Sequence, residues 1–171
     1  MTELVNDPFY QFLEDEYPDL ELDYVILSVK EPYSGASSHQ NAVCEALFPI
    51  LSKRLRDDDE DEPFTLIPSK MQSSSCTPDE LFEECLEEGR MNYWYAFSSQ
   101  PNGVTYDKKD FKRVNDKLFP KSNRDELEVF SWNNDFSDYF DDGKEWWGTG
   151  LWSIYDPALN RFVIIGASLT D

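Results

Sequence analysis

The spacing of apolar residues predicts helices that alternate with strands. Asp7 followed by proline is typical of a helix start, and the β-branched run 22–30 predicts a strand that is buried on both faces. Serines at 37–38 are expected to cap a second helix, which Pro49 should kink or shorten. One face of that helix carries an apolar stripe of Ala42, Val43, Ala46, Leu47, Ile50 and Leu51.

The middle of the chain continues this alternation. A short strand is expected at 64–67, and Thr77 followed by proline and two acids predicts a capped helix that Gly89 ends. Over 91–98 two sets of residues alternate, which favours a strand followed by a turn at 101–103. One face would carry Met91, Tyr93, Tyr95 and Phe97, and the other Asn92, Trp94, Ala96 and Ser98.

The last part of the chain is expected to complete a sheet. Asp107 should cap a basic helix, and 127–132 predicts a further strand. The runs 151–155 and 161–167 flank a turn-forming loop and predict a C-terminal hairpin. Residues 1–171 are therefore expected to form a single α+β domain, with helices packed on a mixed or antiparallel sheet in two or three layers.

The charge of the chain narrows the choice of partners. A net charge of -20 accompanies 40% hydrophobic and 15% aromatic residues. Disordered acidic tails lack such apolar content, so this composition predicts a folded domain with a strongly negative surface. A negative surface attracts cationic partners and repels nucleic acid.

The sequence favours a cytoplasmic location. The N-terminus lacks the basic and apolar regions of a secretory signal, and the apolar runs are shorter than the ~20 residues that cross a bilayer. Cys44, Cys76 and Cys85 form no CxxC pair, and their odd number leaves a thiol unpaired, which favours a reducing compartment. We therefore expect no membrane anchor, and a monomer or weak dimer.

Residues for conventional catalysis are sparse. His39 is the single histidine of the chain, which excludes a histidine metal cage, and Cys44 lies on a different face of the predicted helix. The acids of 135–145 recur every three residues, unlike the two-residue spacing of a calcium loop. Phosphate-binding glycine loops and nucleophile-elbow motifs do not occur. No catalytic residue, metal or cofactor is therefore expected.

Seven of the 15 lysines and arginines lie between residues 108 and 124. A basic helix of this kind can bind phosphate. In a chain of net charge -20, pairing of these cations with acidic neighbours of the same molecule is the simpler interpretation, and nucleic-acid binding is not expected.

Acidic clusters beside aromatic residues predict a surface that binds a protein. A charge run alone often serves solubility, but this many like charges destabilise a small domain, and a cationic partner relieves the repulsion. Two tryptophans, Trp146 and Trp147, follow the acidic segment 135–145, and alternation along a strand should expose one and bury the other. The predicted partner-binding residues are Asp57, Asp58, Asp59, Glu60, Asp61, Asp135, Asp138, Tyr139, Asp141, Asp142, Glu145, Trp146 and Trp147.

The C-terminal block Tyr139–Asp171 reads YFDDGKEWWGTGLWSIYDPALNRFVIIGASLTD. With its Glu-Trp-Trp-Gly and Trp-Ser-Ile-Tyr-Asp pieces, it resembles the C-terminal segments of small bacterial immunity proteins that are encoded beside polymorphic or contact-dependent toxins. The resemblance implies a non-enzymatic cytosolic inhibitor that binds and neutralises a toxin domain, often a basic nuclease.

Charge and resemblance thus favour the same function. A nuclease presents cations to phosphate, and an acidic protein is able to occupy that cleft by matching its potential. Two alternatives stay open. A DNA mimic, such as an anti-restriction protein, would array carboxylates along an elongated surface, and a small carboxylate-dependent enzyme would hold two of them in a deep cleft.

Overall fold

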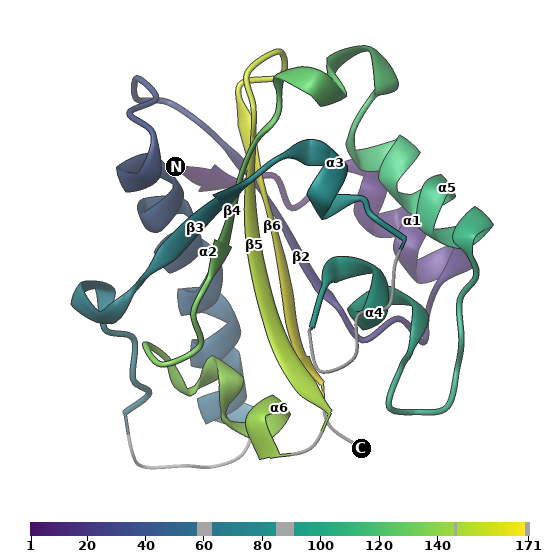
Figure 1. Cartoon of the computed structure of the whole chain (residues 1–171). Coiled ribbons are helices and arrows are strands. Elements are labelled where there is room, and N and C mark those ends of the chain that lie inside the picture. Colours follow the sequence, from purple (N-terminus) through teal and green to yellow (C-terminus); the bar gives the residue numbers. More distant parts are fainter. Residues whose placement is uncertain (58–62, 85–90, 146, 170–171) are drawn as a thin grey trace.

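A six-stranded sheet forms the centre of the protein (Figure 1), in a computed structural model that describes residues 1–57, 63–84, 91–145 and 147–169. The strand order is β1-β2-β6-β5-β4-β3, and each of these neighbours pairs antiparallel. The expected α+β class and C-terminal hairpin are confirmed. The strands are β1 (Thr2–Glu3), β2 (Asp23–Ser28), β3 (Ser73–Cys76), β4 (Glu128–Trp132), β5 (Gly148–Asp156) and β6 (Arg161–Leu169).

Helices cover both faces of the sheet, which gives three layers (Figure 1). The long helix α2 and the short elements η3 and α6 pack on one face, and α1, α3, α4 and α5 pack on the other. The helices are α1 (Pro8–Glu16), α2 (Ala36–Asp57), α3 (Pro78–Leu81), α4 (Tyr93–Ser98), α5 (Lys108–Leu118) and α6 (Asp141–Glu145), with 3-10 turns η1 (Pro68–Lys70), η2 (Lys121–Glu126) and η3 (Asp138–Phe140).

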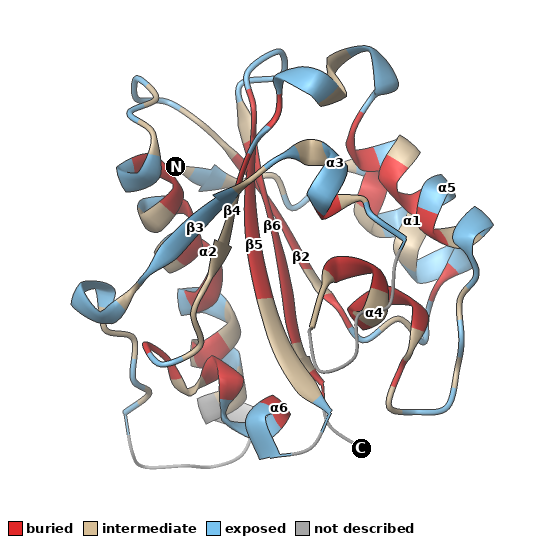
Figure 2. Ribbon diagram, in the orientation of Figure 1, coloured by how far each residue is buried: buried red, intermediate tan, exposed pale blue. Residues whose placement is uncertain are grey.

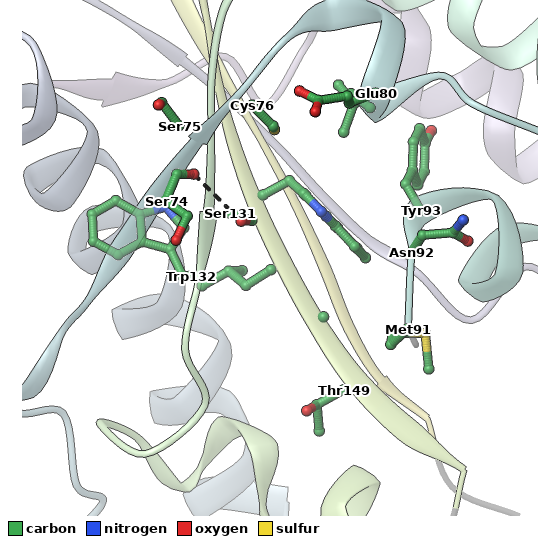
Figure 3. Close-up of a pocket in the computed structure, with 14 residues that line it drawn as sticks. Ser74, Ser75, Cys76, Glu80, Met91, Asn92, Tyr93, Ser131, Trp132 and Thr149 are labelled. Carbon is green, nitrogen blue, oxygen red and sulfur yellow. Dashed lines mark hydrogen bonds between the residues drawn. The ribbon is translucent and has the colours of Figure 1, made fainter. Parts of the chain in front are cut away.

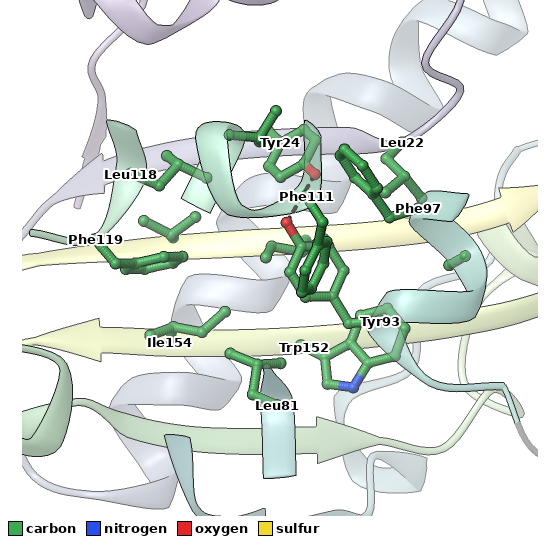
Figure 4. Close-up of a cluster of buried hydrophobic side chains, with 14 of the residues drawn as sticks. Leu22, Tyr24, Leu81, Tyr93, Phe97, Phe111, Leu118, Phe119, Trp152 and Ile154 are labelled. Atoms are coloured by element: carbon green, nitrogen blue, oxygen red, sulfur yellow. Dashed lines mark hydrogen bonds between the residues drawn. The ribbon is translucent and has the colours of Figure 1, made fainter. Parts of the chain in front are cut away.

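The central strands are buried on both faces (Figure 2). In β2, Tyr24 and Ile26 enter the core below α1, α4 and α5, whereas Val25 and Leu27 enter the core below α2. The prediction for the β-branched run is therefore confirmed. The first core is rich in aromatic rings, and in it the hydroxyl groups of Tyr24 and Tyr93 form a hydrogen bond of 2.9 Å (Figure 4).

Three predicted helix starts are confirmed by their caps. The Asp7 carboxylate accepts a hydrogen bond from the Phe9 amide, and Thr77 and Asp107 each form a reciprocal capping box. These bonds satisfy amide groups that would otherwise lack a partner in the first helical turn.

The predicted strand over 91–98 is wrong. This segment forms helix α4, because Asn92 caps it and pairs four residues apart, such as Tyr93 with Phe97, both enter the core. Packing of these rings against Phe111 of α5, at centroid distances of 4.9 and 5.2 Å, outweighs the two-residue alternation of the sequence.

Four further boundaries differ from the prediction. Helix α2 begins at Ala36, so Ser37 and Ser38 lie inside its first turn and do not precede it as caps. The expected strand at 64–67 is reduced to a single bridge between Leu66 and Ser137. Helix α3 ends at Leu81, and the Glu80 side chain takes part in its N-terminal capping box. In a longer helix, Glu80 would also lie next to the like charge of Glu84. Pro49 does not shorten helix α2, which spans 22 residues and continues past this proline to Asp57.

A directional chain of hydrogen bonds joins α2 to the sheet at His39, whose side chain is fully buried. The Glu128 carboxylate accepts from the Tyr33 hydroxyl at 2.7 Å, so the Tyr33 oxygen accepts from His39 Nε2 at 3.0 Å. His39 Nδ1 then accepts from the Ser153 hydroxyl at 2.8 Å, and the Ser153 oxygen accepts from the Trp132 indole at 2.8 Å. Burial lowers the pKa of His39 from 6.5 to about 4, so the imidazole is neutral at pH 7, and the chain places its single proton on Nε2.

This network predicts a loss of stability in acid. Because the folded pKa of His39 lies below the unfolded value of 6.5, the unfolded chain binds the extra proton as the pH falls from 6.5 to about 4. The free energy of unfolding should lose on the order of 3 kcal/mol from this group across that range, and nothing from it above pH 6.5. In His39→Gln, urea unfolding at several pH values should show a smaller loss. Equal losses in both proteins would exclude this role, because the chain has no other histidine.

Candidate functional site

Acidic side chains gather on a short segment at one end of the sheet. Residues 135–145 hold five acids against one lysine. Four of these acids are exposed, and Asp138 is half-buried. Within the part of the chain that the structure describes, Lys144 pairs with Asp141 at 3.4 Å, and no lysine or arginine pairs with the other acids of the segment. We call this set the acidic end: Asp135, Asp138, Asp141, Asp142 and Glu145.

The acidic end is fixed to the core by the aromatic residues between its acids. Phe136, Tyr139 and Phe140 are each 0% exposed and pack below α2. The Tyr139 hydroxyl donates to the Asp23 carboxylate at 2.7 Å, where burial raises the pKa of Asp23. Gly166, the partner of Asp23 in the sheet register, leaves the space that the Tyr139 hydroxyl occupies. The acids are therefore presented from a rigid base.

The burial of Tyr139 contradicts its expected contact with a partner. Its ring is covered by the guanidinium of Arg54, which lies 5.1 Å from the ring centroid and also donates to the Tyr139 carbonyl oxygen. Tyr139 thus positions its acidic neighbours instead of meeting a partner itself.

The second predicted cluster, 57–61, lies mostly outside the described residues: Asp57 ends α2, and Asp58, Asp59, Glu60 and Asp61 are not described. Described residues on either side of this cluster contact the segment 135–145. Arg54 bonds to Tyr139, while the Thr65 amide donates to the Asp138 carboxylate and the Asp138 amide donates to the Thr65 carbonyl oxygen at 3.2 Å. Described residues before and after 58–62 therefore both lie against residues 138–139.

Trp147 is 39% exposed beside α6, as expected for one tryptophan of the predicted pair, while Trp146 lies outside the described residues. The Trp147 indole nitrogen donates to the Ser99 carbonyl oxygen at 2.9 Å. This bond ties the start of β5 to the end of α4 and leaves part of the ring accessible.

Most of the cations of α5 have an acidic or aromatic partner within the molecule. Arg113 pairs with Glu16 of α1 at 2.9 Å, and Asp116 accepts from Lys112 and Arg124 at 2.8 Å each. Lys117 lies 5.3 Å from the centre of the Phe12 ring. Intramolecular pairing, the simpler of the two interpretations, thus matches the geometry of this basic helix, and the excess of negative charge lies elsewhere.

Two aromatic residues outside the predicted site contact each other, and one of them, Phe64, directly precedes Thr65, which binds Asp138. Phe48 of α2 is 57% exposed, and its ring packs edge-to-face on that of Phe64 at a centroid distance of 5.3 Å. The helical pattern contained a signal for Phe48, because this residue falls outside the apolar stripe that faces the core.

A pocket of about 300 Å³ lies on the opposite face of the sheet, between β3–β5 and the start of α4 (Figure 3). Its lining is mainly hydroxyl, amide and indole groups. Glu80 is the single carboxylate among the described lining residues, and it accepts from the Thr77 amide at 2.6 Å. The pocket therefore lacks, in its described lining, the pair of carboxylates that the enzyme alternative needs. Lining residues include Ser74, Cys76, Asn92, Ser131 and Trp152.

Neither metal-ligand groups, membrane-spanning helices nor similarity to known proteins points to a functional site in the described residues. Among the described residues, His, Cys, Asp and Glu side chains form no group of three that would hold a metal ion. No described helix combines the length and apolar character that a bilayer crossing requires. Comparisons with protein-family models, curated proteins and solved structures give no match.

The contact between Tyr139 and Gly166 predicts how firmly the acidic end is held. In Gly166→Ala the new methyl group would overlap the Tyr139 hydroxyl, so we expect a loss of about 1–3 kcal/mol in the free energy of unfolding. Tyr139→Phe should cost about 1 kcal/mol, because Asp23 loses its donor.

The double variant should lose less stability than the sum of the two single losses, since it lacks the Tyr139 hydroxyl that would overlap the new methyl group. Urea unfolding of the four proteins measures this coupling. Strict additivity would mean that the hydroxyl does not occupy the space above Gly166.

Proposed function

We propose that this protein is a cytosolic inhibitor of the immunity type, which binds and neutralises a cationic toxin domain, in the first instance a nuclease. The observation that carries the proposal is the acidic end: a rigidly anchored segment with five acids and one lysine. The resemblance of the C-terminal block to immunity proteins supports the same class.

Electrostatics explains why a cationic protein is the expected partner. The backbone that carries these carboxylates is anchored to the core, so it loses little conformational entropy when a partner binds. An acidic surface facing a basic cleft accelerates association and disfavours partners of the wrong charge. Nuclease domains present such clefts, because they must contact phosphate.

The arrangement favours this function over the DNA-mimic alternative. A DNA mimic would place carboxylates along an elongated surface, whereas the acidic end lies within residues 135–145. The cations of 108–124 also interrupt the negative surface on the α5 side of the molecule.

Neutralising the acids of α6 should weaken the complex. In Asp141→Asn/Asp142→Asn/Glu145→Gln, affinity for the inhibited toxin should fall by about threefold to 150-fold, since exposed charges are worth about 0.2–1 kcal/mol each. Binding and nuclease inhibition are measured against a panel of purified cationic toxin nucleases, at low and moderate salt. The affinity of the unmodified protein should decrease as salt increases.

The matched control is Glu14→Gln/Asp15→Asn/Asp19→Asn, which makes the same change in net charge at exposed acids in and just after α1. This control should retain nearly full affinity. The proposal fails if no nuclease of the panel is inhibited, or if both triple variants weaken binding equally.

A further inference from the structure

Phe48 projects from α2 away from the core. The buried stripe of this helix, which includes Ala46, Leu47 and Leu51, is at most 3% exposed, whereas Phe48 is 57% exposed. One step along a helix turns the side chain by about 100°, so the residue after Leu47 cannot share its direction. Phe48 therefore contributes little to the core that α2 builds.

The ring of Phe48 is nevertheless held in place. It meets the Phe64 ring at an interplanar angle of 82°, and Phe64 itself is half-buried against the core below α2. Edge-to-face packing is the favoured geometry of two aromatic rings. We call these two residues the aromatic pair. A ring that is already ordered loses little entropy on binding.

Carboxylates border the aromatic pair on two sides. Glu45 is exposed and lies three residues before Phe48, on the same face of α2. On the other side, Phe64 precedes Thr65, whose amide holds the Asp138 carboxylate of the acidic end. An aromatic centre with a charged rim is the usual arrangement of a binding hot spot.

We infer that the aromatic pair is the apolar anchor of the partner interface, and that it receives an amphipathic segment of the cationic protein. One apolar side chain of that segment packs on Phe48, and flanking lysines or arginines meet Glu45 and Asp138. This inference rests on the proposed function. Charge complementarity selects this occupant over a second copy of the chain, because a second copy of charge -20 would bring carboxylates against carboxylates.

Two peptides of equal length and charge test the inference. One carries lysine and leucine at helical spacing, and in the other each leucine is replaced by serine. Each is titrated into isotope-labelled protein, and amide shifts are followed by NMR. The leucine peptide should bind about tenfold more tightly, with its largest additional shifts at Phe48, Phe64 and Thr65.

Phe48→Ser should reduce this preference to about twofold or less. The matched control is Val5→Ser, which removes an even more exposed apolar side chain, 64% accessible, from the turn before α1. It should keep the preference. Thermal unfolding of both variants checks that they are folded, as expected for substitutions of exposed side chains.

The outcomes separate the two proposals. Equal binding of both peptides, or a preference that survives Phe48→Ser, overturns the aromatic anchor and leaves the acidic end in place. Failure of both peptides to shift the acidic end removes the electrostatic basis of the proposed function. Sedimentation of the protein alone that shows a dimer lost in Phe48→Ser would assign the pair to self-association and overturn the inferred occupant.

Discussion

The burial of β2, β5 and β6 on both faces is the constraint from which the rest of the structure follows. A sheet covered on one side could leave polar residues facing water, but these strands carry apolar side chains on both sides. The chain must therefore supply a helical layer for each face. Apart from carboxylates such as the buried Asp156 and the half-buried Asp23, the acids of this highly charged chain are therefore expected at the outer surface of those layers or in the loops between them.

The two helical layers differ in how their charged side chains are paired. On the α5 side, cations of one helix meet acids of the same helix and of α1, so attraction offsets much of the local repulsion. On the α2 side, Lys144 is the one lysine among the acids of 135–145, and the segment is held by aromatic burial instead of by ion pairs. A field that is uneven in this way gives the protein a preferred direction for meeting a cation.

Much of the fold could be predicted from the sequence, because its signals are local. The caps at Asp7, Thr77 and Asp107 and the hairpin of β5 and β6 depend on residues a few positions apart. The helix over 93–98 is harder to predict, since beyond its local cap at Asn92 its rings are ordered by Phe111 and Trp152, which lie far along the chain. The same holds for the pairing of His39 with Ser153, which joins residues 114 positions apart.

The candidate site shows the same division between local and distant information. Composition locates the acids of 135–145, but it cannot distinguish Tyr139, which is buried, from an exposed anchor, because that depends on the space above Gly166. Phe48 presents the opposite case, since its exposure follows from its position on α2 alone. An apolar residue that falls outside the stripe of its own helix is thus a better sign of a binding surface here than an aromatic residue among acids. The buried Tyr139 helps to hold the acids in place, whereas the exposed Phe48 contributes little to the core.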